Sequence, residues 1–371
     1  MLLKVGDRNP LVAFFQFVLK ENNYYLGSID GIFGNQTKEA VISFQKSLNL
    51  SQSGIIDDEL VKELLPYITV PTSIPYTYEI TNIVIQAILY KYNFLQMQNI
   101  GKSVMQKDIN CIKIGNGTNH VLYVGSTHAN EWITTPLLLK FVQDYSDAYS
   151  KGENIYDKNS TELFNKTTLY IVPLHNPDGV DLVNEAIDTN SEEYLNAVQI
   201  SNNYPNIPFP EGWKANILGI DLNLQFPARW NEAKEIKFNQ GFISPAPRDY
   251  VGVFPLEAPE ALALYDFTIS NNFRLMNTFH TQGKVIFWKF LNYNPPNSEV
   301  IAKEFAKVSG YSLQDTPYAS SFAGFKDWFI QNYNLPGYTI ECGLGVNPLP
   351  IAQFDEIYND VLGIMVLGIW L

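Results

Sequence analysis

Apolar residues in the first part of the chain recur at the three- and four-residue spacing of helices that bury one face. Segments 9–22 and 36–48 show this spacing, and a third helix is expected after Asp57, whose carboxylate suits an N-cap. The run SIDGIFG between the first two segments predicts a tight turn, and Gly31 in it is echoed by Gly54 before the third helix. The pattern predicts a small three-helix domain over residues 1–67.

A different pattern begins after residues 68–76, a stretch with two prolines among threonines and a serine that predicts a short, semi-stiff linker. From residue 77 onward, short continuous apolar runs alternate with helical segments. We expect strands at 121–125, 169–174, 275–280 and 338–343, and helices at 134–145, 258–270 and 355–367. This alternation predicts an α/β domain over residues 77–371, with a mixed, largely parallel sheet sandwiched by helices.

The charge balance narrows the range of partners. The 371 residues include 25 basic and 38 acidic side chains, which give a formal net charge of −13. Nucleic acid and anionic membrane are disfavoured, because binding them requires clustered lysine and arginine. No stretch reaches the ~20 apolar residues of a membrane span, and the N-terminus does not resemble a secretory signal. We expect a protein that is cytoplasmic as synthesised, with two free, buried thiols at Cys111 and Cys342.

Histidine is scarce, and two of the four histidines lie at the ends of expected strands. His128 follows the strand at 121–125, His280 ends the strand at 275–280, and Glu131 comes three residues after His128. In parallel sheets the working residues lie at the carboxyl ends of strands. Two histidines and one carboxylate form the open, three-ligand type of catalytic zinc site. Spacing alone leaves ordinary core histidines as the alternative.

Longer runs around these residues resemble the zinc metallocarboxypeptidase family. The matching runs occur in the family's order across about residues 77–371, and they are GSTHANEWITTPLLL, PLHNPDGV, FHTQG and TIECG. The resemblance implies a carboxypeptidase A-like fold and one zinc ion held by His128, Glu131 and His280. It also implies that Glu341 acts as the general base toward zinc-bound water. A buried carboxylate paired with a base is the alternative for Glu341.

Two further positions match catalytic residues of the family less closely. Tyr318, in TPYASSFAGFKDW, matches the family's mobile tyrosine, although the segment is one residue longer, and an ordinary packed tyrosine is the alternative. Lys214, in EGWKAN, aligns with the arginine that polarises the scissile carbonyl. A lysine can stabilise the developing oxyanion as a point charge, and an exposed, solvated lysine is the alternative.

Departures from the family pattern argue against trimming of free C-termini. Where the family has an Asn-Arg pair, this chain has Asn223 followed by Leu224, and leucine cannot bind a carboxylate through two hydrogen bonds. Asn130 replaces an arginine that often lies between the first two zinc ligands. Arg248, in SPAPRDY, is the best remaining candidate for binding a substrate carboxylate. We therefore expect Asn130, Asn223 and Arg248 to contact substrate.

Two resemblances indicate the substrate. The runs DLNLQFPARW, IKFNQGFISPAPRDYVG and APEALALYDFT resemble bacterial γ-D-glutamyl-L-diamino acid endopeptidases, which hydrolyse the γ-D-glutamyl–meso-diaminopimelate bond of peptidoglycan stem peptides. Residues 3–65 resemble the peptidoglycan-binding domain of bacterial wall hydrolases, with a generic helical cap as the alternative. Together they imply a zinc endopeptidase whose partner is peptidoglycan or its muropeptide fragments. An exo-acting metallocarboxypeptidase on ordinary peptides and a non-catalytic wall-binding protein are the alternatives.

Overall fold

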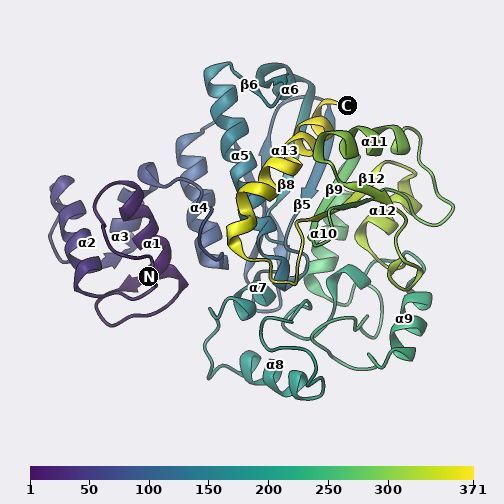
Figure 1. Ribbon diagram of the computed structural model, residues 1–371, viewed down its shortest axis with the longest axis horizontal. Coiled ribbons are helices and arrows are strands. Elements are labelled where there is room, and N and C mark those ends of the chain that lie inside the picture. Colours follow the sequence, from purple (N-terminus) through teal and green to yellow (C-terminus); the bar gives the residue numbers. More distant parts are fainter.

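The computed structural model describes residues 1–371, and its N-terminal part contains the three expected helices (Figure 1). The elements of this helical module are α1 (Pro10–Glu21), α2 (Asn35–Ser47), α3 (Asp58–Leu64) and the short antiparallel strands β1 (Leu2–Leu3) and β2 (Ile56–Asp57). The side chain of Asn9 caps α1 by accepting a hydrogen bond from the backbone N–H of Val12. The Asp57 side chain caps α3 in the same way through Leu60. The helices are confirmed, whereas two-residue strands carry no periodicity that a sequence pattern could reveal.

Two buried glutamines explain why the loops before α2 and α3 are similar. Gln16 Oε1 accepts hydrogen bonds from the backbone N–H groups of Asp30 at 3.0 Å and Gly31 at 2.9 Å. Gln45 Oε1 accepts the corresponding bond from Gly54 at 2.9 Å. Gly31 and Gly54 have positive φ angles of +69° and +67°, a conformation that favours glycine. A buried amide side chain therefore holds each turn in the same way.

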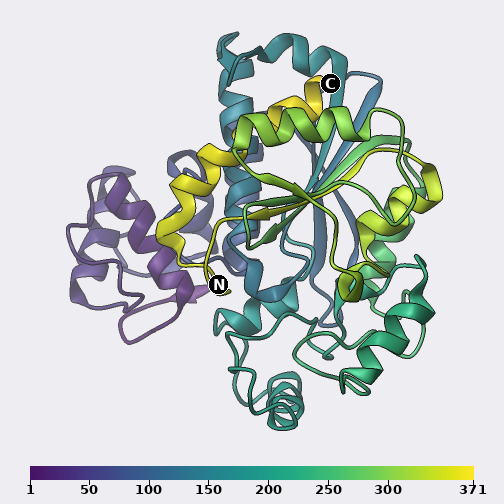
Figure 2. The ribbon, with the colours of Figure 1, turned by 45° about the vertical axis from the view of Figure 1, so that its right-hand side comes forward.

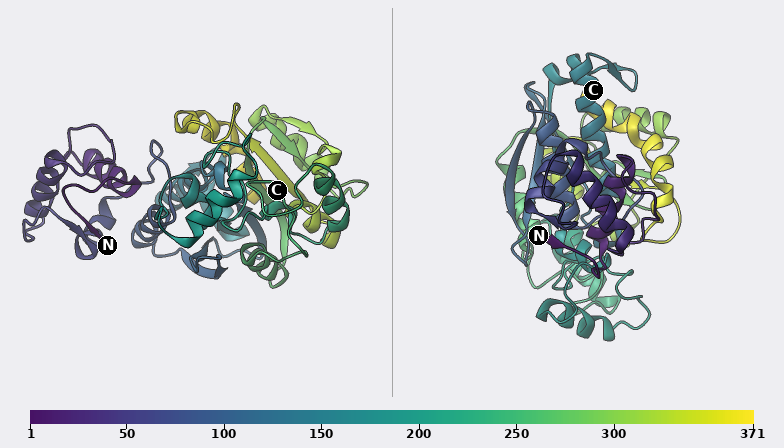
Figure 3. Two further views of the ribbon diagram at one scale, coloured as in Figure 1. Left: turned by 90° about the horizontal axis from the view of Figure 1, so that it is seen from below. Right: turned by 90° about the vertical axis from the view of Figure 1, so that its left-hand side faces the viewer.

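Residues 68–76 lie packed against the larger part of the chain. The backbone N–H of Val70 donates to Gln143 Oε1 at 2.9 Å. The carbonyl oxygen of Tyr76 accepts a hydrogen bond from Asn184 Nδ2 at 2.8 Å, and the Tyr76 ring is buried. Figure 3 shows the helical module to one side of the larger domain. The connecting segment is thus held by packing and hydrogen bonds along its length.

The larger part of the chain is built on an eight-stranded sheet with the strand order β11-β10-β12-β9-β5-β8-β4-β3. Its parallel centre consists of the four strands expected from the apolar runs, which are β5 (Asn119–Val124), β8 (Thr167–Val172), β9 (Phe273–Thr281) and β12 (Gly337–Cys342). The outer strands are β3 (Gln96–Lys102), β4 (Asp108–Ile114), β10 (Val285–Phe287) and β11 (Ser312–Gln314). Because β4 and β10 run antiparallel to their inner neighbours, the sheet is mixed and largely parallel, as predicted.

Side chains of the central strands alternate between two apolar cores, one on each face of the sheet. On β5, Val121 and Tyr123 belong to one core, whereas Leu122 and Val124 belong to the other. The first core includes residues of α4 (Tyr78–Lys91), α5 (Thr134–Lys151), α11 (Ser298–Ser309) and α13 (Phe354–Trp370). The second includes residues of α9 (Trp230–Asn239), α10 (Pro259–Ile269) and α12 (Phe325–Tyr333). Helices therefore cover both faces of the sheet, as Figure 2 shows, and the predicted sandwich is confirmed.

The remaining elements are short. They are α6 (Ser160–Lys166), α7 (Pro177–Val183), α8 (Glu192–Asn202), the strands β6 (Asn154–Ile155) and β7 (Lys158–Asn159), and the 3-10 helices η1 (Leu65–Tyr67), η2 (Ala129–Glu131), η3 (Leu222–Leu224), η4 (Tyr318–Ser320) and η5 (Ile351–Gln353). Cys111 and Cys342 are free and buried, as expected. None of the helices combines the length and the apolar character that crossing a membrane requires.

Candidate active site

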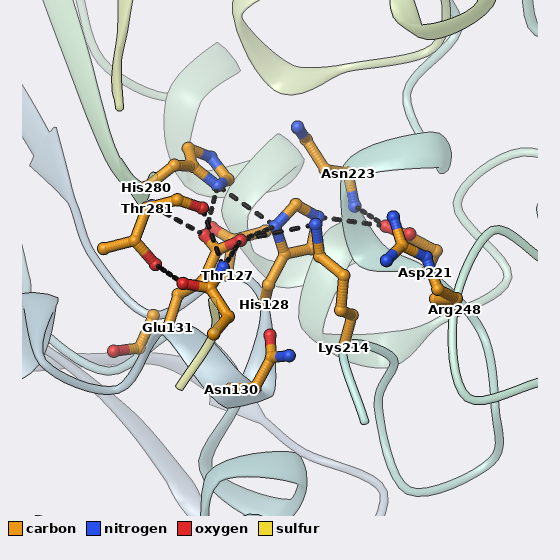
Figure 4. A network of polar contacts seen from close by, with 12 residues as sticks. Thr127, His128, Asn130, Glu131, Lys214, Asp221, Asn223, Arg248, His280 and Thr281 are labelled. Carbon is orange, nitrogen blue, oxygen red and sulfur yellow. Dashed lines mark hydrogen bonds and ion pairs between the residues drawn. The ribbon is translucent and has the colours of Figure 1, made fainter. Parts of the chain in front are cut away.

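Three buried side chains converge at the carboxyl ends of the neighbouring parallel strands β5 and β9 (Figure 4). His128 follows β5, Glu131 lies in the 3-10 helix η2, and His280 is near the end of β9. His128 Nδ1 is 3.0 Å from Glu131 Oε1, and His280 Nδ1 is 2.8 Å from Glu131 Oε2. A short loop joins β5 to η2 and ends at His128, the N-cap of η2, so residues three apart in sequence direct their side chains to one point.

The geometry of this cluster fits a zinc ion. One ligand atom from each residue lies within 4.8 Å of the others. The two Nδ1 atoms are 3.1 Å apart, close to the ~3.3 Å expected for two nitrogens on one tetrahedral zinc ion. Although burial opposes ionisation of Glu131, the charges of His128, Lys214 and His280 hold its pKa well below the usual value. The donor set is thus two imidazoles and an ionised carboxylate, and three protein ligands leave a fourth position open.

Asp221 orients the first histidine of the cluster. Its Oδ1 lies 3.2 Å from His128 Nε2 and also accepts a hydrogen bond from the backbone N–H of Asn223 at 3.1 Å. Burial opposes ionisation of Asp221, yet the neighbouring His128 and Lys214 lower its pKa. A carboxylate on Nε2 keeps the proton there and leaves Nδ1 able to bind a metal ion. Sequence reasoning missed Asp221, although it lies in the run GIDLNL that was used to place Asn223.

A cleft of about 640 Å³ opens beside the cluster, and Lys214, Thr281 and Glu341 line it. Glu341 lies on β12 directly across from His280 of β9. Burial, together with the Glu131 carboxylate, raises the pKa of Glu341 to about 8. Thr281 connects the cleft to the cluster, because its backbone N–H donates to Glu131 Oε2 at 3.3 Å.

Lys214 reaches the cluster itself. Its Nζ lies 3.3 Å from Glu131 Oε1, and its side chain is only 17% exposed, so it is not a solvated surface lysine. The backbone N–H of Lys214 donates to the carbonyl oxygen of Pro247 at 2.7 Å. Its own carbonyl oxygen accepts from Ala129, the residue after His128, at 3.0 Å. These backbone bonds fix the lysine beside the ligand loop.

The three residues expected to contact substrate all line the cleft. Asn130 Nδ2 donates to the carbonyl oxygen of Glu211 at 3.2 Å, while its Oδ1 is buried without a partner. Arg248 Nε donates to Asp249 Oδ2 at 2.6 Å and its side chain is about half exposed. Asn223 Oδ1 accepts from a backbone N–H at the start of α12. Their positions are compatible with binding a polar substrate.

Of the residues expected to act in catalysis or substrate binding apart from the metal cluster, only Tyr318 does not line this cleft. It begins η4, is 70% exposed, and packs edge-on against Phe322 at a ring distance of 5.1 Å. It lines a neighbouring pocket of about 390 Å³, whereas Pro317 and Ser320 of the same loop line the main cleft. Two residues of the loop therefore line the main cleft, whereas the tyrosine lines the neighbouring pocket.

This sheet, with a two-histidine, one-glutamate cluster at its carboxyl edge, defines a class of metallopeptidase. The zinc carboxypeptidase family matches residues 83–362, and the chain belongs to that family; it is a zinc metallopeptidase. A peptidoglycan-binding domain family matches residues 8–64. Over 280 residues the chain is 46% identical to gamma-D-glutamyl-L-diamino acid endopeptidase 1 of Lysinibacillus sphaericus, covering 76% of this chain and 68% of that protein.

More distant relatives share the fold. Mast cell carboxypeptidase A of Homo sapiens is 25% identical over 230 residues, covering 60% of this chain and 48% of that protein. The structure of thrombin-activatable fibrinolysis inhibitor superposes with a TM-score of 0.63 at 17% identity, over 99% of this chain and 97% of that one. Carboxypeptidase A from Helicoverpa armigera superposes with a TM-score of 0.59 at 18% identity, over 87% and 85% of the two chains. These structures confirm the carboxypeptidase-like architecture.

Proposed function

We propose that this protein is a zinc endopeptidase that hydrolyses the bond between γ-D-glutamate and meso-diaminopimelate in peptidoglycan stem peptides. The observation that carries the proposal is the convergence of His128, Glu131 and His280 on one point beside a polar cleft that Glu341 lines. The name of the Lysinibacillus relative supports the bond, and the peptidoglycan-binding domain supports the polymer.

In this proposal, His128, Glu131 and His280 hold one zinc ion, whose contribution when bound is Lewis-acid activation of water and of the scissile carbonyl. Asp221 keeps His128 in the orientation and tautomer that ligation requires. Glu341 takes the proton of the attacking water and delivers it to the leaving amine. Its place in the cleft beside the cluster suits this exchange, because a proton carrier must lie next to the reacting groups.

Lys214 is proposed to stabilise negative charge on the scissile carbonyl oxygen. Its ammonium is held beside Glu131, and its pKa is raised because, against burial, Glu131 and Asp221 favour the charged form. A fixed positive charge in a buried site stabilises a developing oxyanion more strongly than it would in water. We also propose that Tyr318 swings over bound substrate, which requires the η4 loop to turn its ring toward the cleft.

Substrate carboxylates are proposed to bind Arg248, with Asn130 and Asn223 as uncharged hydrogen-bonding partners. Leu224, which stands where the family has an arginine, is buried in the second core. The chain therefore lacks the usual clamp for a free C-terminal carboxylate at that position, which favours an endopeptidase over an exo-acting carboxypeptidase.

We propose that different parts of the chain bind and cleave the substrate. Residues 1–67 would bind the wall or its muropeptide fragments, residues 68–76 would join the two parts, and residues 77–371 would cleave. The packing of residues 68–76 on the larger domain supports a fixed geometry between the two activities.

The test is incubation of the zinc-loaded protein with L-Ala-γ-D-Glu-meso-diaminopimelate, followed by mass spectrometry. We expect the dipeptide L-Ala-D-Glu to appear and a chelator to abolish it. Glu341→Gln should slow the reaction by about 10²- to 10⁴-fold while retaining zinc in a metal analysis, because only the proton carrier is lost. Absence of cleavage by the zinc-loaded protein, or removal of C-terminal residues from ordinary peptides instead, would contradict the proposal.

A further inference from the structure

The cleft contains a pair of buried charges that the proposed mechanism does not use. Lys326 and Asp327 both line it, and Lys326 Nζ lies 2.5 Å from Asp327 Oδ1. Their side chains are only 5% and 4% exposed. A buried ion pair gains little stability over an apolar pair, because both ions lose their hydration. Its presence in the wall of a substrate cleft therefore suggests a role in binding.

Each member of the pair retains capacity for a ligand. Lys326 Nζ donates to Asp327 Oδ1 and to the carbonyl oxygen of Lys289 at 2.8 Å, so one of its three hydrogens is free. Among side chains, Asp327 accepts a hydrogen bond from Lys326 alone, which leaves acceptor positions on its carboxylate. Burial raises the pKa of Asp327 despite the attraction of Lys326, so a second cation would be favourable there. The pair thus offers a donor and an acceptor side by side.

A strip of side chains on β12 and β10 lines the same cleft as the pair and includes Glu341. Thr339 and Glu341 are two apart on β12 and face the same side, about 7 Å from one another. Across the ladder they pair with Phe287 and Val285 of β10, which also line the cleft. Thr339 and Val285 contribute methyl groups to the lining of the cleft, and Phe287 contributes a ring. This apolar lining suits a short methylene chain.

We propose that Lys326 and Asp327 recognise the second amino-acid centre of diaminopimelate, the end of its side chain that carries an ammonium and a carboxylate on one carbon. Lys326 donates to that carboxylate and Asp327 accepts from that ammonium, while the methylene chain lies along the strip. This inference rests on the proposed function and specifies which diamino acid the cleft selects. Lysine, which has the ammonium without the carboxylate, leaves the third N–H of Lys326 without an acceptor and places a second ammonium beside it.

The pair should give a measurable preference between two stem peptides that differ only at this centre. Charge-assisted hydrogen bonds of this kind correspond to a preference of about 10- to 100-fold. We expect kcat/KM of the zinc-loaded full chain to be higher by this factor for L-Ala-γ-D-Glu-meso-diaminopimelate than for L-Ala-γ-D-Glu-L-lysine. In the double variant Lys326→Met with Asp327→Asn, the ratio should fall toward one. Changing both residues avoids leaving one buried ion without a partner.

Lys289→Met is the matched control, because the Lys289 side chain pairs with Asp315 and lines the neighbouring pocket instead. It should leave the ratio unchanged. A wild-type ratio of one, or a double variant that unfolds like wild type and keeps the full ratio, overturns the inference.

Calorimetric binding of free meso-diaminopimelate and free L-lysine separates this inference from the proposed function. If the protein cleaves neither peptide yet binds meso-diaminopimelate more tightly, and the double variant loses that preference, the recognition stands and the endopeptidase proposal fails. Equal binding of the two amino acids by the wild type overturns the recognition.

Discussion

The helical module and the catalytic cleft both bury polar side chains, but they satisfy them differently. In the module, Gln16 and Gln45 hydrogen-bond to backbone groups of the loops that they hold. Beside the cleft, Asn130 Oδ1 and His280 Nε2 are buried with no partner. An unpaired buried polar group costs about 1–3 kcal/mol, and a ligand that pairs with these two atoms would recover that free energy. Buried polarity builds the structure of the module, whereas in the cleft it is held ready for binding and catalysis.

The largest predicted effect is a loss of stability in the helical module, and it tests whether buried polar groups hold that structure together. Gln16→Ala removes the acceptor of the Asp30 and Gly31 N–H groups, and two unpaired donors should cost about 4 kcal/mol of unfolding free energy. Thermal unfolding followed by circular dichroism should show the module melting earlier, with Gln52→Ala, at an exposed position, as the control. Cleavage of a free stem peptide should be unchanged. If Gln16→Ala melts like wild type, the amide is not what holds the turn.

The buried carboxylate of Glu260, away from the cleft, tests the comparison further, because it should make the free energy of unfolding depend on pH. Burial raises the pKa of Glu260 from 4.5 to about 7, although Asn216 Nδ2 donates to it at 3.1 Å. Between these two pH values the folded protein binds more protons than the unfolded chain, so the free energy of unfolding falls as the pH rises through this window. The decrease should reach about 3 kcal/mol by pH 8.

Denaturant unfolding at pH 5 and pH 8 measures this slope. Glu260→Gln should flatten it relative to wild type, because the variant has no proton to lose, whereas Glu235→Gln on the exposed surface should not. An unchanged slope in Glu260→Gln would show that other groups carry the dependence.

The smallest of these effects is expected at the metal cluster. Asp221→Asn replaces the carboxylate that faces His128 Nε2 and should weaken zinc binding by about 10- to 100-fold. Competition with a chromogenic chelator measures the affinity, and Asp266→Asn, on the exposed face of α10, is the control. Equal affinities of wild type and Asp221→Asn would mean that the loop alone orients the histidine.

The elements predicted well from sequence are those with long, regular patterns. The four central strands are continuous apolar runs because both of their faces are buried. By contrast, β10 and β11 are three residues each and lie toward one edge of the sheet, where too few positions exist to show a period. The proline content of residues 68–76 predicts a linker, but composition does not reveal which surface covers the segment.

The residues of the candidate site likewise divide into those that could be assigned from the sequence and those that could not. His128, Glu131 and His280 could be proposed as a metal site from their spacing and their places at strand ends, and the family resemblance added Glu341. Asp221 could not be assigned from spacing, because its contact with His128 spans 93 positions. The roles of Lys214 and Tyr318 likewise depended on exposure, and the structure leaves only 17% of the lysine side chain exposed but 70% of the tyrosine.

The sequence by itself determined the helical module, the parallel centre of the sheet and the chemical types of the metal ligands. These depend on periodicity and short-range order, which are properties of neighbouring residues. Only the tertiary structure decided which distant charges meet, such as Asp221 with His128 and Lys214 with Glu131. The physical reason is that electrostatic and hydrogen-bonding interactions act over a few ångströms of space, and the packing of the sheet and its helices sets those distances.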